Sequence, residues 1–220
     1  MNMRFRIDLK IFIFLIIFYF TNQIEIYTMI MLFALIHEIG HLLMGLLIGM
    51  KPEKIELMPF GVSISFKIKV EEYNKKIKKG NLLEIKKMVV ALAGPLTNFI
   101  IIIITNNLKI DIFKSLMIIY TNFLIMIFNL LPIYPLDGGR ILKGILHINF
   151  GIRTTEFYIN IISKIMVAII TILSSILILY VHNIAILFID LYLWYLVLKE
   201  DVKYKKREEI YNKILENQNI

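Results

Sequence analysis

Cysteine is absent from the 220 residues, and charged residues are scarce. Without cysteine the chain can form no disulfide, and no thiolate can serve as a nucleophile or metal ligand. Charged residues make up only 19% of the sequence, whereas 58% of it is hydrophobic. Soluble domains usually contain roughly 45–50% apolar residues. The composition therefore excludes an ordinary soluble domain and favours a protein embedded in a lipid bilayer.

Long apolar runs account for this composition. Six apolar segments can be drawn: Ile11–Thr21, Thr28–Met50, Met88–Thr105, Ile112–Leu131, Ile162–Val181 and Ile184–Leu198. The second to the fifth approach or reach the roughly 20 residues that a helix needs to cross the hydrocarbon core. No Ala-x-Ala-like cleavage site precedes Tyr27, so the first segment is interpreted as an uncleaved span. The sequence predicts an all-α membrane protein with about six transmembrane helices.

The basic residues are distributed unevenly between the connections. All but two of the 25 Lys and Arg residues lie before the first segment, after the second, after the fourth, or in the tail. Only Lys109 and Lys114 fall on the other side. Positive charge marks the cytoplasmic face, so both termini are expected in the cytoplasm. The net charge of +8 is thus explained by topology, with the lipid bilayer rather than a nucleic acid as the partner.

The second segment contains the sequence His37-Glu38-Ile-Gly-His41. Residues four apart share one helix face, so the two imidazoles can hold a Zn²⁺ ion. Glu38 can then act as general base toward a water that the metal activates. An acidic side chain at the centre of a span costs about 2.5–3.5 kcal/mol or more, which indicates a functional role. The segment predicts one zinc ion per chain, with Glu38 as the catalytic residue.

A catalytic zinc keeps three protein ligands, and Asp137 is the best candidate for the third. Pro132 and Pro135 precede it, two glycines follow it, and together they break the helix where the fourth segment ends. Irregular backbone at membrane depth is tolerated where it lines a watery cavity. His147 and His182 are poorer candidates because of their places in the topology. The pattern is equally compatible with an ordinary turn in which the aspartate caps a helix.

The connection after the second segment contains a stretch of alternating apolar and polar residues. Its apolar positions are Val62, Ile64, Phe66, Ile68 and Val70. A period of two is typical of a strand, so we expect a short membrane-associated β-ribbon here. Its edge could pair with an unwound substrate by strand addition, or the ribbon could lie at the membrane surface. The sequence leaves both roles open.

These residues together resemble the site-2 protease family of intramembrane zinc metalloproteases. His37-Glu38-x-x-His41 matches the metal motif, and Asn129-x-x-Pro132-x-x-Pro135-Leu136-Asp137-Gly138 matches the second motif. Ala93-Gly94-Pro95-x-x-Asn98 matches a further signature, in which Asn98 is interpreted as hydrogen-bonding between helices. The resemblance is close over Phe33–Arg140 and rests on topology elsewhere.

The resemblance implies a zinc metalloendopeptidase that cleaves a membrane-associated protein near the cytoplasmic face. It implies that Asp137 is the third zinc ligand. It also implies that Asn129 binds the scissile carbonyl or the developing oxyanion of the substrate. Two further interpretations are left open: a membrane-embedded prenyl-protein protease with glutamate as third ligand, and a metal transporter or scaffold. Asp190, inside the last segment, receives no role.

Within the family the chain most resembles the sporulation branch, which processes the pro-sequence of sigma factor K. Glu56–Gly61 resembles that branch, although Val62 stands where a second glycine is usual. The branch implies a bacterial cell membrane or forespore membrane, and it leaves an inhibitory membrane partner and a homo-oligomer open. Residues 1–198 are expected to form the protease domain. Residues 199–220 are expected to form a short cytoplasmic tail without a CBS domain, and Lys51–Lys87 is too short for a PDZ domain.

Overall fold

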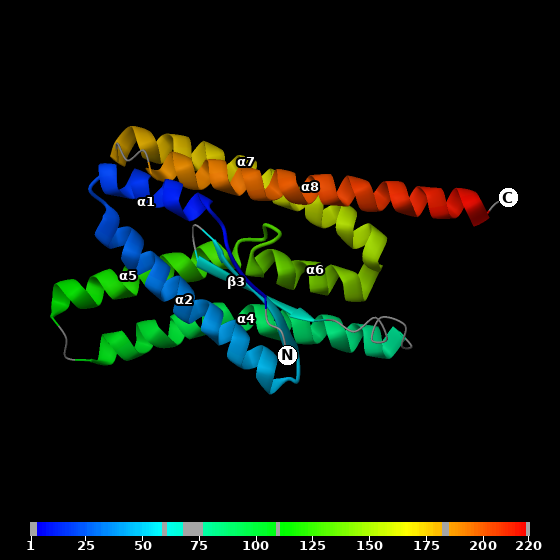
Figure 1. The fold of residues 1–220 in the computed structure, drawn as a ribbon, viewed down its shortest axis with the longest axis horizontal. Helices are drawn as coiled ribbons and strands as arrows, with labels where there is room; N and C mark the ends of the chain where they lie inside the picture. The colour runs from blue at the N-terminus through cyan, green and yellow to red at the C-terminus, as the bar shows by residue number, and fades with distance from the viewer. Residues whose placement is uncertain (1–3, 59–60, 68–76, 109–110, 182–184, 219–220) are drawn as a thin grey trace. The chain divides into compact units, whose positions relative to one another are not determined.

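The structure is a computed structural model that describes residues 4–58, 61–67, 77–108, 111–181 and 185–218. Within these residues the chain is mostly helical and carries one small sheet, as the ribbon in Figure 1 shows. It divides into two compact units, Met1–Leu130 and Leu131–Ile220. The mostly helical architecture confirms the predicted fold class.

The first unit is built on three long helices. Its described helices are α1 (Lys10–Phe20), α2 (Ile24–Leu47), α4 (Ile77–Asn107) and α5 (Ile112–Leu130). Helices α4 and α5 run antiparallel, and α2 crosses them (Figure 1). At the crossing, a Cβ on Gly40 would lie 2.1 Å from Thr97 Oγ1 and 3.0 Å from the Ala93 carbonyl oxygen. A glycine here lets the two helix backbones approach closely, as is common between membrane helices.

A three-stranded sheet follows α2 and completes the first unit. The chain leaves the helix through Gly49, whose φ of 79° suits a glycine. Strands β2 (Lys51–Met58) and β3 (Gly61–Lys67) pair antiparallel with Ile55 opposite Ile64, which confirms the predicted ribbon. The ring of Phe66 packs on Gly45, where a Cβ would lie 2.2 Å from it. Ile68 and Val70, predicted to extend the strand, lie outside the described residues.

The sheet has one strand that the sequence did not predict. Strand β1 (Arg4–Ile7) pairs in parallel with β2, so the strand order is β1-β2-β3. Four residues are too few to show the alternation that marks a strand. The pairing therefore depends on β2, which lies more than 40 residues further along the chain.

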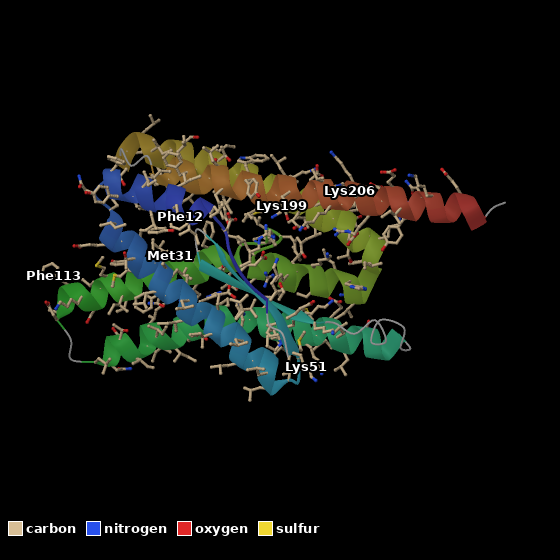
Figure 2. The ribbon with its side chains drawn as sticks, in the orientation of Figure 1. Phe12, Met31, Lys51, Phe113, Lys199 and Lys206 are labelled. Carbon is tan, nitrogen blue, oxygen red and sulfur yellow. The ribbon has the colours of Figure 1, made fainter. Side chains whose placement is uncertain are left out.

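The second unit contains a short helix and a long helical hairpin. Its described helices are α6 (Asp137–Phe150), α7 (Ile152–Val181) and α8 (Ala185–Gln218), and α7 and α8 lie antiparallel (Figure 1). Gly151 separates α6 from α7 with a φ of 76°. Helix α8 is continuous across residue 198, where the sequence placed the start of the tail. Lys199 and Lys206 mark its charged part in Figure 2.

The distribution of side chains is that of a membrane protein. Among the residues that the structure describes, four helices are long and apolar enough to cross a bilayer: Ile24–Leu47, Asn81–Asn107, Ile112–Leu130 and Ile152–Tyr180. Helix α1 is apolar but shorter, and α8 combines an apolar half with a charged one. Phe113 is 84% exposed, whereas Asn98 and Asn122 are fully buried. Apolar groups facing outward and polar groups facing inward suit lipid as the solvent. The chain is therefore an integral membrane protein.

Candidate metal centre

Helix α2 brings the three predicted residues of the H-E-x-x-H motif together. One ligand atom each of His37, Glu38 and His41 lies within 4.8 Å of the others. Both histidines are only 2% exposed, whereas Glu38 is half-buried. The spacing of four places the imidazoles one above the other on the helix face that meets α4. The buried pair can hold a metal, and the more accessible carboxylate stays within reach of water.

Hydrogen bonds to the outer ring nitrogens orient both imidazoles. His41 Nδ1 lies 2.7 Å from the Val90 carbonyl oxygen, which can only accept, so this nitrogen carries the ring proton. The Gly94 amide nitrogen lies further from the same Nδ1, at 3.2 Å. His37 Nδ1 makes a short hydrogen bond with Asn98 Oδ1. With both protons on Nδ1, each histidine presents an unprotonated Nε2.

The two Nε2 atoms fit a divalent metal. They lie 3.1 Å apart. Two nitrogens at about 2.0–2.1 Å from a tetrahedral zinc are about 3.3 Å apart, close to this value. Without a cation, two nitrogen lone pairs at this distance would repel each other. The donor atoms, their tautomers and their spacing therefore suit zinc.

Gly94 of α4 lies directly against this pair. A Cβ on Gly94 would lie 2.4 Å from the Nε2 atoms of both His37 and His41. Real Cβ atoms essentially never make contacts this short. Only glycine therefore leaves room for the two imidazoles, and for anything that they bind, beside α4.

Asp137, the predicted third ligand, is the first residue of α6 in the second unit. It is buried, and Arg140 Nη1 lies 3.6 Å from its Oδ1. The loop before it is held in place at two points. The Tyr134 amide donates to Ser163 Oγ at 2.9 Å, and Gly139 lies so close to Ile133 that a Cβ would be 2.4 Å from its carbonyl carbon. The ligand role of Asp137 stays a prediction.

Asn129, predicted to bind the scissile carbonyl, lies near the end of α5 in the first unit. It is half-buried, and its Nδ2 donates to the Ile125 carbonyl at 3.0 Å. This bond uses one of the two amide hydrogens and fixes the side chain against its own helix. The oxyanion role of Asn129 also stays a prediction.

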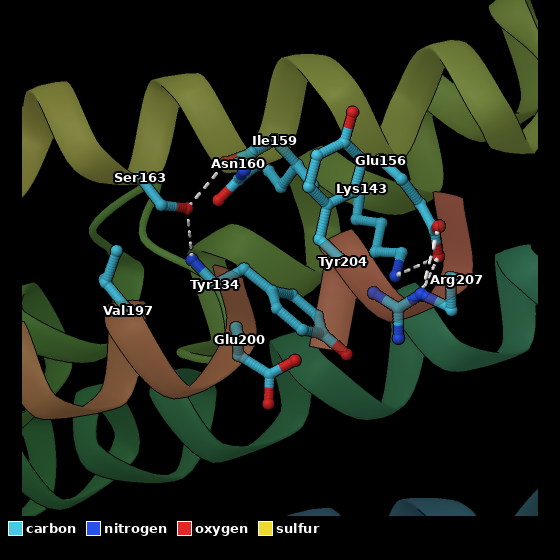
Figure 3. A pocket seen from close by; sticks show the side chains of 10 residues that line it. All are labelled: Tyr134, Lys143, Glu156, Ile159, Asn160, Ser163, Val197, Glu200, Tyr204 and Arg207. Atoms are coloured by element: carbon cyan, nitrogen blue, oxygen red, sulfur yellow. Dashed lines mark hydrogen bonds and ion pairs between the residues drawn. The ribbon is translucent and has the colours of Figure 1, made fainter. Parts of the chain in front are cut away.

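A polar pocket in the second unit lies next to the loop that carries Asp137. Figure 3 shows its lining residues: Tyr134, Lys143, Glu156, Ile159, Asn160, Ser163, Val197, Glu200, Tyr204 and Arg207. Glu156 is 5% exposed and accepts a hydrogen bond from Arg207 Nε at 3.1 Å, with Lys143 Nζ 3.6 Å away. Lys143 Nζ also lies 4.6 Å from the centre of the Tyr134 ring. These contacts connect the Asp137 loop with α7 and α8.

Sequence reasoning missed several of these residues. It gave no role to Gly94, and it interpreted Asn98 only as a link between helices. Both lie in the Ala93–Asn98 signature, so the motif was a signal whose physical meaning comes from the structure. Asn122, Glu156 and Arg207 had no local signal, because their partners lie far away in the sequence.

A buried H-E-x-x-H pair in an apolar helix defines a membrane-embedded metalloprotein. The model of peptidase family M50 matches residues 25–109 and 105–173, more than half of the chain, and the chain belongs to this family. This confirms the predicted family. The motif predicted a zinc metalloprotease. The family and a similar curated protein confirm this enzyme class.

Two curated relatives and one solved structure are similar to the chain. It is 35% identical over 138 residues to a zinc metalloprotease of Methanocaldococcus jannaschii, a match that covers 58% of this chain and 36% of that protein. It is 28% identical over 133 residues to stage IV sporulation protein FB of Bacillus subtilis, covering 56% and 40%. The matches thus span less than half the length of either relative. A site-2 protease structure from Methanocaldococcus jannaschii has the same fold, with a TM-score of 0.63, 24% identity and 91% of each chain covered.

Proposed function

We propose that the chain is a zinc metalloendopeptidase that cleaves a membrane-associated protein. The observation that carries this proposal is the pair of buried Nε2 atoms 3.1 Å apart, with the Glu38 carboxylate within 4.8 Å of the histidine ligand atoms. His37, His41 and Asp137 would hold one zinc ion. When bound, the zinc supplies Lewis-acid polarisation of the scissile carbonyl and makes a water molecule more acidic.

The side chains of the protein supply the rest of the chemistry. Glu38 accepts the proton of the attacking water and delivers it to the leaving amine, which is general acid–base catalysis. The half-buried position of Glu38 suits this role, because its carboxylate is more accessible than the two buried histidines and lies close to their ligand atoms. Asn129 has a second amide hydrogen besides the one bonded to Ile125, and we propose that it binds the carbonyl oxygen of the substrate.

The proposed orientation rests on the lysine distribution. Within the first unit, Lys51 lies just beyond the end of α2, far from Phe113 at the start of α5, as Figure 2 shows. We propose that the basic connections and both termini face the cytoplasm, so that cleavage occurs near that side. Residues 1–198 would then form the protease domain and 199–220 a cytoplasmic tail.

The substrate proposal is supported by similarity to stage IV sporulation protein FB. We propose a pro-sigma-K-like, membrane-associated pro-protein as the substrate and the forespore membrane as its place. We also propose regulation by an inhibitory membrane partner or by formation of a homo-oligomer. The support for these two proposals is the resemblance to the sporulation branch.

Two substitutions test the enzyme and its metal. The full chain is co-expressed with candidate pro-proteins, and cleavage and zinc content per chain are both measured. Glu38→Gln should slow cleavage by about 10²–10⁴-fold with zinc still bound, because it removes only the base. Asp137→Ala should lose zinc and cleavage together. Asp111→Ala, at the exposed residue just before α5, and Glu209→Gln, at an exposed position in α8, are matched controls that should change neither zinc content nor cleavage.

The outcomes separate the alternatives. Full cleavage by Glu38→Gln would overturn the proposed mechanism. Retention of zinc and cleavage in Asp137→Ala would favour a protease whose third ligand is a glutamate. Metal flux into sealed vesicles without any proteolysis would favour a transporter.

A further inference from the structure

A chain of buried amides connects His37 with a third helix. Asn98 on α4 bonds His37 Nδ1 through its Oδ1, and its Nδ2 donates to Asn122 Oδ1 on α5 at 2.8 Å. Asn122 Nδ2 in turn donates to the Ile118 carbonyl of its own helix at 2.9 Å. Asn98 and Asn122 are both 0% exposed. The side chain of His37 is therefore linked through two amides to the backbone of α5.

We propose that Asn122 is a positioning residue for the zinc site, acting through Asn98 to fix the tautomer and the orientation of His37. The inference rests on the proposed zinc-binding function. It assigns to Asn98 and Asn122 a role beyond joining helices. The donors and acceptors in this series of hydrogen bonds can be arranged in only one direction, and that direction determines which nitrogen of His37 carries the proton.

The Ile118 carbonyl sets that direction. A carbonyl oxygen can only accept, so the amide group of Asn122 that faces it must be the Nδ2 donor. The Oδ1 of Asn122 then faces Asn98 and requires a donor, which must be the Nδ2 of Asn98. This turns the Oδ1 of Asn98 toward His37, where it can only accept. His37 must therefore carry its proton on Nδ1, which makes Nε2 the unprotonated nitrogen that would bind the metal.

The membrane setting makes this order strict. Reversing either amide would bring two oxygens or two N–H groups face to face, and side chains that are 0% exposed have no contact with bulk solvent to relieve the conflict. An asparagine that only joined two helices could do so with a single hydrogen bond, in which its side chain either donates or accepts. Here each amide uses both its Nδ2 and its Oδ1, in a consistent order that ends at the ring of a proposed metal ligand. Groups that hold the outer nitrogen of a ligating histidine typically change metal affinity about 10–100-fold when removed.

The experiment measures zinc binding by the full chain in detergent, independently of cleavage. Zinc affinity is measured by competition with a chelator, and the visible absorption of the Co²⁺-substituted protein reports the ligand geometry. Asn122→Leu and Asn98→Leu each interrupt the series of hydrogen bonds at a different residue, and leucine has a side-chain shape similar to that of asparagine. Asn98→Asp keeps an acceptor for His37. Thr121→Val is the matched control, because buried Thr121 bonds only the Met117 carbonyl of its own helix.

We expect graded results that a purely structural role would not produce. Asn98→Leu should weaken zinc binding about 10–100-fold. Asn122→Leu should weaken it several-fold and change the Co²⁺ spectrum in the same sense. Asn98→Asp should bind zinc more tightly than Asn98→Leu, because it retains the acceptor for His37, but more weakly than wild type, because it loses the donor to Asn122 Oδ1. Thr121→Val should match wild type in affinity and spectrum.

The contrary results are equally definite. Wild-type affinity and spectrum in Asn122→Leu would overturn the inference, as would equal losses in Asn122→Leu and Thr121→Val. If Asn122→Leu does not fold, as judged by helical circular dichroism without metal, Asn122→Ala makes the same test with a smaller side chain. A wild-type chain that binds no zinc would overturn the proposed function, and the inference with it. If the wild-type chain binds zinc and Asn122→Leu binds it equally well, only the inference fails and the proposed function stands.

Discussion

Replacing Gly94 by alanine would place a methyl group against both proposed metal-binding nitrogens. The new Cβ would lie 2.4 Å from the Nε2 atoms of His37 and His41 and 2.5 Å from Cε1 of His41. Non-bonded heavy atoms prefer separations of about 3.5–4.0 Å, so the rings or the helix must move by about 1 Å. Because the contacts are made with the nitrogens themselves, the methyl group occupies space that the ligand atoms need.

The surrounding hydrogen bonds limit how the protein can adapt. Each ring is held at Nδ1, by Asn98 and by the Val90 carbonyl, so moving a ring breaks a buried hydrogen bond at a cost of about 1–3 kcal/mol. Moving α4 instead costs about 1–3 kcal/mol for overpacking. We therefore expect a loss of about 1–3 kcal/mol in zinc binding, which is roughly 5–150-fold in affinity. Helix propensity works in the opposite direction, since alanine is better than glycine by about 1 kcal/mol.

Zinc competition and substrate cleavage should both report this loss. Gly45→Ala is the matched control: its Cβ would lie 2.2 Å from the end of the Phe66 ring, a side chain that can turn away. It should weaken the packing of β3 on α2 while zinc affinity stays within about threefold of wild type. Wild-type zinc affinity and cleavage in Gly94→Ala would refute the steric argument.

Two predictions concern the second unit. Glu156→Gln removes the buried charge that Arg207 contacts and should lower the free energy of unfolding by about 1–3 kcal/mol. Glu209→Gln, at the surface, should leave the free energy of unfolding close to that of wild type. Equal effects of the two substitutions in denaturant titrations would contradict this. Burial raises the pKa of Asp201, but hydrogen bonds from Lys164 and its neighbours outweigh it and lower the pKa to about 2. Because this pKa lies below the ordinary aspartate value of 3.8, the carboxylate contributes about 2 kcal/mol of stability that is present above about pH 4 and lost as the pH falls through about 2. Asp201→Asn should remove that part of the acid sensitivity of unfolding, and an unchanged pH profile would contradict the assignment.

The H-E-x-x-H residues could be predicted because their arrangement is local. Residues 37 and 41 share a face in any α-helix, so the sequence alone determines that their rings are neighbours. The cost of placing polar groups in lipid then distinguishes a functional site from an accident. The antiparallel ribbon could be predicted equally well, since the alternation of apolar and polar residues is visible within seven residues.

The groups that orient the histidines could not be predicted in the same way. The Val90 carbonyl, Asn98 and Asn122 lie on two other helices, 49 residues from His41, 61 from His37 and 24 from Asn98 respectively. Their meeting depends on how α4 and α5 are rotated about their axes, and apolar segments that face lipid on one side carry little periodicity to reveal this. The same holds for Glu156 and Arg207, which are 51 residues apart.

One regularity on α4 nevertheless connects the two motifs. Val90, Gly94 and Asn98 follow one another at intervals of four, so they form one stripe along the helix. The stripe supplies a carbonyl for His41, a space for both Nε2 atoms and an acceptor for His37, in that order. Along α2 the order of the rings is reversed, which is what two antiparallel helices in contact require. The glycine and asparagine of the third segment are therefore the physical complement of the two histidines. Substitutions in this stripe should therefore weaken zinc binding more than they lower the stability of the fold.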